Sequence, residues 1–280
     1  MSCILAPDAW EIALARWISL GMTGCQEVAT PLGTESKCFF KTRDARGAAE
    51  AELRGLWPGL AIKIFEVPDQ DWNAKWKESM EPALVAPGVW VSPKWLPPPL
   101  SENDHWIKIE PKMAFGTGHH ATTRRAAAAI KKLSQNLWGG YSLLDIGCGA
   151  GVLCFVAELC GAGKTLGIDI DAVCAENLAE NRRENPGAHS NAFAIGTLDM
   201  LRGASLFDCI VMNMISAESG PLLKHVFSLL KSGGILIWSG LLINEKNTII
   251  AHASRQGFSL CDETFEEEWW CGVFRKTSLV

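Results

Sequence analysis

The positions of apolar and polar residues predict two kinds of element along the second half of the chain. Short apolar runs, typical of buried strands, alternate with longer segments in which apolar residues recur every three or four positions. After a helix that begins near residue 122, strands are expected at residues 164–168, 192–195, 207–212 and 235–239, and helices at 152–160, 172–184, 221–230 and 245–256. A hairpin at 258–263 and 269–274 follows. Strands that alternate with helices predict an α/β domain with a largely parallel sheet.

The beginning of the chain has a different pattern. Helix-like spacing at residues 6–20 and 44–56 is interleaved with strand candidates at 3–5, 26–30, 37–41 and 60–67. The order strand, helix, strand, strand, helix, strand predicts a small α+β domain of the ferredoxin-like type over residues 1–68. Such a fold does not by itself indicate a function.

A connecting arm rich in tryptophan and proline is expected at residues 69–105, before a second domain at 106–280. Its composition favours an ordered arm over a flexible linker, with a helix near residues 71–80 and an extended run after it. The tryptophans could form a binding surface, but packing of the arm onto the domains is the favoured interpretation.

A glycine turn follows the first apolar run of the second domain. The apolar run of Leu143 and Leu144 stops at Asp145, and three glycines follow at positions 147, 149 and 151. This pattern is typical of a buried strand that ends in a turn leading into a helix. A dinucleotide fingerprint would need its third glycine at position 152, where the chain has Val152. The sequence D-x-G-x-G-x-G instead resembles motif I of class I S-adenosylmethionine methyltransferases. A purely structural turn is the alternative.

A second acidic residue supports the interpretation of the turn as a nucleotide site. The strand expected at residues 164–168 delivers Asp169 to the same edge of the sheet as the glycines. In this topology, a carboxylate about 20 residues beyond the glycines bonds the ribose hydroxyls. Asp145, Gly147, Gly149 and Asp169 are therefore candidate cofactor-binding residues.

Composition and charge narrow the class of protein. The chain has 280 residues, of which 48% are hydrophobic and 20% charged, and a net charge of −5, which is ordinary for a soluble protein with two domains. This charge disfavours a nucleic-acid surface and favours a basic protein substrate. The ten cysteines include no C-x-x-C pair and are expected to be reduced thiols of a cytoplasmic protein. Neither a membrane span nor a secretion signal is indicated.

Two further motifs narrow the chemistry. Asn213 ends the strand at residues 207–212, where a ligand at the sheet edge would meet it, although it could also cap the next helix. Methylases of planar amines have N-P-P-Y or D-P-P-Y at this position, and the chain has N-M-I-S. An sp3 amine such as lysine therefore remains open as acceptor. The other motif is the loop A-F-G-T-G-H-H-A-T-T at residues 114–123.

That loop, together with D-I-G-C-G-A-G and the asparagine at the strand end, resembles the ribosomal protein L11 methyltransferase family. The resemblance covers residues 71–280 by motif and the first 70 residues only by pattern. It implies a Rossmann-like, seven-stranded methyltransferase domain, S-adenosylmethionine as cofactor, amino groups of ribosomal protein L11 as substrate, and an N-terminal domain that holds this substrate. A cytoplasmic monomer with no membrane partner and no direct nucleic-acid substrate is expected.

Residue roles also follow from the resemblance. Cofactor contacts are implied for Thr123, Gly147, Asp169 and Asn213, a loop over the cofactor for Thr117 and Gly118, and an adenine contact for Thr197 and Leu198. Asn213 and His120 are the catalytic candidates, with His120 orienting the loop. A metal pair of His119 and His120 is not favoured, because no partner ligands accompany them.

The expected mechanism needs no enzyme nucleophile and no metal, because the sulfonium is already activated. The enzyme has to align and desolvate an unprotonated amine, and an apolar pocket of Phe115, Met214 and Ile215 would lower the pKa of a lysine. The sequence M-I-S-A-E after Asn213 departs from the common I-L-A-x-P of the family, which leaves open another protein lysine or a small amine as substrate. A non-catalytic cofactor-binding protein and an NAD-dependent oxidoreductase are the remaining alternatives.

Overall fold

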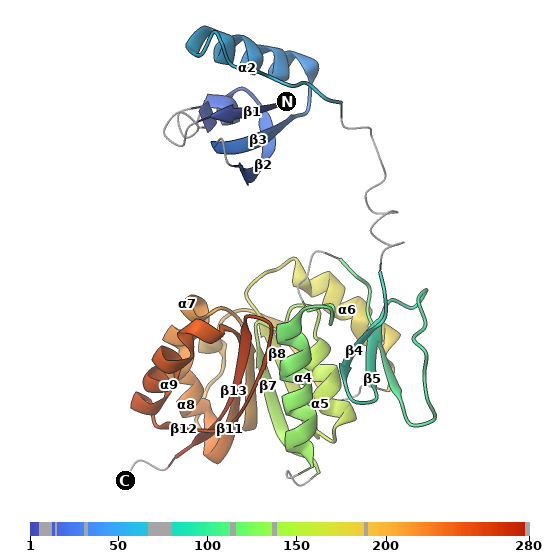
Figure 1. Ribbon diagram of the computed structural model, residues 1–280. Coiled ribbons are helices and arrows are strands. Elements are labelled where there is room, and N and C mark those ends of the chain that lie inside the picture. The colour runs from blue at the N-terminus through green and yellow to red at the C-terminus, as the bar shows by residue number, and fades with distance from the viewer. Residues whose placement is uncertain are drawn as a thin grey trace. The chain divides into compact units, whose positions relative to one another are not determined.

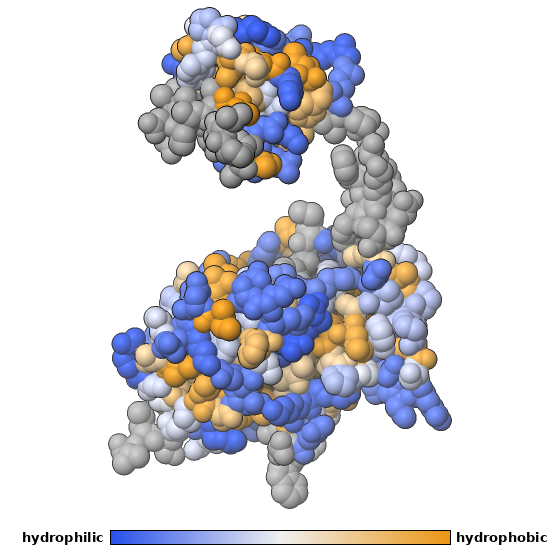
Figure 2. Space-filling model, in the orientation of Figure 1, coloured by the Kyte–Doolittle hydropathy of each residue, from blue (hydrophilic) through white to orange (hydrophobic). Residues whose placement is uncertain are grey.

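The computed structural model describes residues 1–5, 13–14, 16–30, 33–66, 80–112, 116–135, 139–187 and 190–277 (Figure 1). The chain forms two compact units, Met1–Glu78 and Ser79–Val280. In both units, hydrophobic side chains on the visible surface are interspersed among hydrophilic ones (Figure 2). Among the described helices, none is long and apolar enough to cross a membrane.

The first unit is a small antiparallel sheet covered by helices. Its elements are β1 (Ser2–Leu5), β2 (Met22–Thr30), β3 (Gly33–Phe40) and α2 (Arg43–Leu56), and its strand order is β1-β3-β2. Residues 16–19 are also helical, and Trp17, Cys38 and Leu53 lie in the core. The α2 helix begins after Thr42, whose hydroxyl accepts a hydrogen bond from the Ala45 N–H, as a helix N-cap does.

The fourth strand expected in this unit is reduced to a single bridge. Lys63 exchanges two main-chain hydrogen bonds with Ser2 on the free side of β1, and β1 is itself only four residues long. The resulting order of segments, with Lys63 beside β1 and then β3 and β2, is the order of a ferredoxin-like sheet.

The second unit is built on a seven-stranded sheet in the order β12-β13-β11-β10-β7-β8-β9. Its strands are β7 (Ser142–Ile146), β8 (Lys164–Asp169), β9 (Asn191–Ile195), β10 (Phe207–Asn213), β11 (Leu230–Leu242), β12 (Phe258–Glu266) and β13 (Trp269–Lys276). The five strands from β11 to β9 are parallel, and β13 is antiparallel to both of its neighbours.

Helices cover both faces of this sheet (Figure 1). Adjacent residues such as Leu143 and Leu144 belong to different core clusters, because successive side chains of a strand point to opposite faces. One cluster includes α4 (Ala121–Ser134), α5 (Val152–Leu159) and α6 (Cys174–Glu184), and the other includes α8 (Leu223–Leu229) and α9 (Lys246–Arg255). Shorter helices are α7 (Ser216–Ser219), η1 (Leu198–Met200), η2 (Gly220–Leu222) and η3 (Ile243–Glu245).

A second sheet occupies part of the segment expected to be a connecting arm. Its strands are β4 (Ala83–Ala86), β5 (Val89–Ser92) and β6 (His105–Lys108), and it packs into the same core cluster as α4. Three asparagines spaced four apart, two on α6 and the third at its C-cap, bind the backbone at and just after the end of β6. Asn177 and Asn181 bond the Glu110 backbone, and Asn185 bonds that of Lys108. Most of the helix expected near residues 71–80 lies outside the described residues.

Candidate active site

A cleft of about 750 Å³ lies at the carboxyl ends of the parallel strands. Its walls come from the ends of β7, β8 and β10 and from the segments that follow β8, β9 and β10, which is where α/β proteins of this type bind ligands. Of the predicted site residues, the lining includes His120, Gly147, Gly149, Asp169, Leu198 and Asn213.

The glycine turn after β7 leaves room for the Met214 side chain, which a Cβ at Gly147 would meet. Gly147 has φ of +72°, and a Cβ there would lie 2.6 Å from the Met214 Sδ. Gly151 has φ of +81° and begins α5 as its N-cap. The N–H groups of Gly147 and Cys148 both donate to the Ile168 carbonyl, at 2.8 and 3.1 Å. The turn is therefore fixed to β8 while its outer face borders the cleft.

The Asp169 carboxylate is held in place by the backbone around it. One carboxylate oxygen accepts from the Gly149 N–H at 2.8 Å and the other from the Asp171 N–H at 3.0 Å. Each carboxylate oxygen has a further lone pair, so Asp169 can still accept hydrogen bonds from a pair of ligand hydroxyls. The side chain thus joins the glycine turn to the end of β8 at the wall of the cleft.

Asp145 lies beneath the glycine turn and is not part of the cleft lining. Its side chain is buried, with Oδ1 unpartnered among the described residues and Oδ2 3.9 Å from the Cys154 Sγ. Burial, and next the negative charge of Asp169, raise the pKa of Asp145 to about 7. The carboxyl group is therefore close to half-protonated at neutral pH.

Asn213 lines the cleft and carries an acceptor without a partner among the described residues. Its Nδ2 donates to the Thr123 Oγ1 at 3.2 Å, while its Oδ1 is buried and has no partner among the described residues. Thr123 itself is buried and does not line the cleft. Because buried carbonyl oxygens are normally hydrogen-bonded, the free Oδ1 indicates a ligand donor at this point. Met214 and Ile215, which were expected beside the acceptor, also line the cleft, and Phe115 lies outside the described residues.

The loop before α4 is held by side chains at its end. His120 is the N-cap of α4, and its Nδ1 lies 2.8 Å from the Thr122 Oγ1. Its ring packs edge-on against the ring of Trp269, with 4.9 Å between the two ring centroids. His119 Nε2 lies 2.6 Å from the Glu81 carbonyl oxygen, and its Nδ1 lies 3.3 Å from the Thr117 Oγ1. Each of the two histidines therefore has a protein partner.

Gly118 is packed against the small sheet. It has φ of +92°, and a Cβ there would lie 2.8 Å from the Val85 Cγ1. Neither Thr117 nor Gly118 is part of the cleft lining, so their predicted role over the cofactor stays a prediction.

Several lining residues carried no clear signal in the sequence. Trp269 reaches the cleft from β13, and Cys174 from the first turn of α6. Gly240 has φ of +81° where β11 and β13 shift register, and a Cβ there would lie 2.7 Å from the Met214 N. A glycine inside a strand is a known sign of a bulge or a close backbone approach, so only Gly240 could have been found from the sequence.

This fold and this site define a class of protein. The strand order with one antiparallel strand beside β11, the glycine turn without a third fingerprint glycine and the carboxylate at the end of β8 are the features of class I methyltransferases that use S-adenosylmethionine. A cleft of about 750 Å³ with the Asp169 carboxylate and a free Asn213 acceptor fits that cofactor and an amine beside it.

Comparison with known proteins identifies the family. Residues 27–277 match the family model described as Ribosomal protein L11 methyltransferase (PrmA). A protein of that name from Syntrophotalea carbinolica is 33% identical over 237 residues, covering 83% of this chain and 76% of the relative. One from Lactococcus lactis is 33% identical, and the match covers 78% of this chain and 68% of that relative. The chain belongs to the ribosomal protein L11 methyltransferase family and is an S-adenosylmethionine-dependent methyltransferase, as its motifs predicted.

A solved structure supports the fold. The crystal structure of ribosomal protein L11 methylase from Lactobacillus delbrueckii subsp. bulgaricus has a TM-score of 0.62 and 22% identity, covering 71% of this chain and all of that chain. It confirms the Rossmann-like arrangement of the large sheet.

Proposed function

We propose that this enzyme transfers methyl groups from S-adenosylmethionine to amino groups of ribosomal protein L11, with lysine side chains and the N-terminal amine as acceptors. The observation that carries the proposal is made at Asn213, which lines the cleft and whose buried Oδ1 has no partner among the described residues. An oxygen in this position accepts a hydrogen bond from an amine and turns the nitrogen lone pair toward the reaction centre.

Residues around the cleft would hold the cofactor on one side of Asn213. Asp169 would accept from the ribose hydroxyls, the backbone at Gly147 and Gly149 would pass close to the methionine part, and Leu198 would contact the adenine. Asp145 would act through the turn that it supports. When bound, S-adenosylmethionine supplies a methyl group that the positive sulfur has already activated.

Two apolar side chains beside Asn213 would favour an uncharged amine, against the carboxylate of Glu218, which also lines the cleft. Met214 and Ile215 lie next to Asn213 and offer no charge to an ammonium group. An apolar environment disfavours the charged form of lysine and so lowers its pKa from about 10.4. The chain would thereby increase the fraction of amine that has a free lone pair.

The N-terminal unit would hold the protein substrate. It has its own core and its own sheet, so its removal should leave cofactor binding intact. Deleting residues 1–68 should abolish methylation of ribosomal protein L11 while the affinity for S-adenosylmethionine stays within about twofold. Retained methylation of the protein by the shortened chain would refute this role.

The function is tested by mass spectrometry of purified ribosomal protein L11 after incubation with the enzyme and S-adenosylmethionine. We expect mass increases in multiples of one methyl group. Asn213→Ala should reduce the rate at least about 100-fold, as loss of one preorganised polar contact does, and should bind the cofactor within about fivefold of the unchanged chain. Asn244→Ala, at an exposed asparagine, is the matched control and should keep full activity. No methylation by the unchanged enzyme, with cofactor bound, would refute the substrate assignment.

A further inference from the structure

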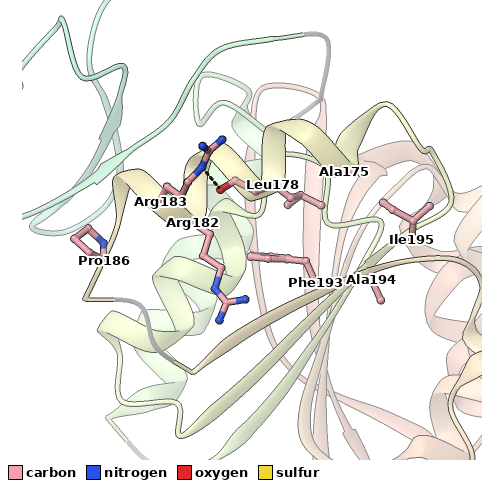
Figure 3. Close-up of a pocket in the computed structure, with 9 residues that line it drawn as sticks. Ala175, Leu178, Arg182, Arg183, Pro186, Phe193, Ala194 and Ile195 are labelled. Carbon is pink, nitrogen blue, oxygen red and sulfur yellow. Dashed lines mark hydrogen bonds between the residues drawn. The ribbon is translucent and has the colours of Figure 1, made fainter.

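A second pocket lies outside the cofactor cleft, between α6 and β9, which is the strand at one edge of the large sheet. It has a volume of about 710 Å³ and is bordered by Leu178, Ala179, Arg182, Arg183, Phe193 and Ile195 (Figure 3). Leu178 is buried, and Phe193 packs against the ring of Phe155, with 5.8 Å between the ring centroids. The pocket therefore has a firm apolar floor.

One wall of the pocket is an unpaired strand edge. Among the described strands, β9 pairs only with β8. The Thr165 N–H donates to the Ser190 carbonyl and the Gly196 N–H to the Asp169 carbonyl, so the main-chain groups of alternate residues from 190 to 196 face β8. The N–H and C=O groups of Phe193 and Ile195 consequently point away from the sheet, and no described backbone group pairs with them.

The pocket is also positively charged. Arg182 and Arg183 extend from the last turn of α6 (Figure 3), and neither forms an ion pair with a described residue. The nearest acidic residues on the same helix have other partners: Glu184 binds Lys94 at 2.9 Å, and Glu180 binds Lys112 at 2.8 Å. The Nε of Arg183 donates to the Ala179 carbonyl at 3.3 Å, and its guanidinium extends in the opposite direction from that of Arg182 (Figure 3). The Arg182 guanidinium is therefore the one available to an acidic ligand, in a chain whose net charge is −5.

We propose that this pocket docks an extended, acidic segment of a partner protein, which adds as a further strand to the free edge of β9. Main-chain hydrogen bonds to Phe193 and Ile195 would give the segment its extended conformation. Because successive side chains of a strand alternate, every second side chain of the segment would rest against Leu178 and Phe193. A carboxylate near its end would meet Arg182.

Two other occupants fit less well. A second copy of this chain, pairing β9 with β9, would bring the arginines of both copies to one interface, and like charges at an interface are unfavourable. A nucleic acid would satisfy the arginines through its phosphates but would leave the strand edge of Phe193 and Ile195 without partners.

The test uses the full chain and capped heptapeptides in which valine alternates either with glutamate or with lysine. We expect the glutamate peptide to bind by calorimetry and to slow hydrogen exchange at the amides of Phe193 and Ile195. Arg182→Glu should weaken this binding at least about fivefold, and Ala179→Trp, at an exposed pocket position, should block it by filling the pocket. Arg255→Glu, in the last turn of α9, is the matched control and should bind the peptide unchanged.

Several outcomes would overturn the proposal. They are equal binding of the lysine peptide, binding without protection of the two amides, or no binding of the glutamate peptide at millimolar concentration. Tighter binding of single-stranded RNA than of the glutamate peptide, with the same loss in Arg182→Glu, would identify a phosphate site instead. Methyl transfer to ribosomal protein L11 is measured separately, so either result leaves the proposed function to its own test.

Discussion

Replacing Asp145 by asparagine should change how the stability of the cofactor-free chain depends on pH. In the folded chain, burial raises the pKa of this carboxyl from 3.8 to about 7. The folded state therefore binds a proton more tightly than the unfolded state between these two values. By linkage, the free energy of unfolding falls as pH rises through this window and is constant above it.

The magnitude follows from the size of the shift. Three pKa units at about 1.36 kcal/mol each correspond to about 4 kcal/mol of lost stability when the titration is complete. At pH 5 the unfolded chain is already ionised at this group, so part of the loss has occurred, and about 2–3 kcal/mol should be lost between pH 5 and pH 8. Asp145→Asn keeps the shape of the side chain and removes this titration.

The assay is urea denaturation of both chains at pH 5 and pH 8. The stability of Asp145→Asn relative to the unchanged chain should increase by about 2–3 kcal/mol between the two pH values. The change with pH is the decisive quantity, because any hydrogen bond that the amide gains or loses contributes equally at both, and all histidines are common to the two chains.

Asp208→Asn is the control, because the pKa of Asp208 is shifted in the opposite direction from that of Asp145. Burial opposes ionisation of Asp208, but hydrogen bonds from Lys231 and Ser142 outweigh it and lower the pKa. Its contribution to stability is thus present above the unfolded pKa and is lost only as pH falls through the folded value. The variant should be destabilised by the same amount at pH 5 and pH 8. A flat difference for Asp145→Asn as well would refute the raised pKa.

Substitutions at three further positions test the cleft and the residue that holds Asn213. Gly147→Ala should weaken cofactor binding at least about tenfold, because its Cβ would lie 2.6 Å from the Met214 Sδ at a φ of +72°; unchanged affinity by calorimetry would contradict this. Thr123→Val removes the acceptor of the Asn213 amide and should lower kcat with little effect on cofactor KM, while Thr123→Ser should restore it. Asp169→Asn should cost about 1.5–3 kcal/mol of cofactor binding, and an unchanged Kd would remove Asp169 from the site.

The sequence predicted most of the sheet because its signals are local. The strands β7 to β10 appear as short apolar runs, and the glycine turn and Asp169 stand at strand ends, where the chain order alone brings them together. The family motif at residues 114–123 and the asparagine at the end of β10 were likewise visible. Family membership confirmed what these motifs indicated.

The sequence could not show how residues distant in the chain reach the cleft. Trp269 approaches His120 because β13 inserts antiparallel beside β11, and nothing local to Trp269 signals this. The strands β4 and β5 were expected only as an extended run within the arm, and β6 at its end was not expected. Two hydrogen bonds across more than 70 residues of sequence fix their edge: the Glu110 N–H donates to Asn181 of α6, and Asn185, which ends this helix, donates to the Lys108 carbonyl.

The pair of threonines at the start of α4 gives the family motif a physical meaning. The carbonyl of Thr122 accepts from the Ser239 hydroxyl at 2.9 Å, which fixes the first turn of the helix to β11. The hydroxyl of the next residue, Thr123, accepts a hydrogen bond from the Nδ2 of Asn213. This bond fixes the side-chain amide of Asn213, whose Oδ1 is left without a partner among the described residues. We infer that the motif orients the acceptor group of Asn213, and that the predicted contact of Thr123 with the cofactor is exerted through that asparagine.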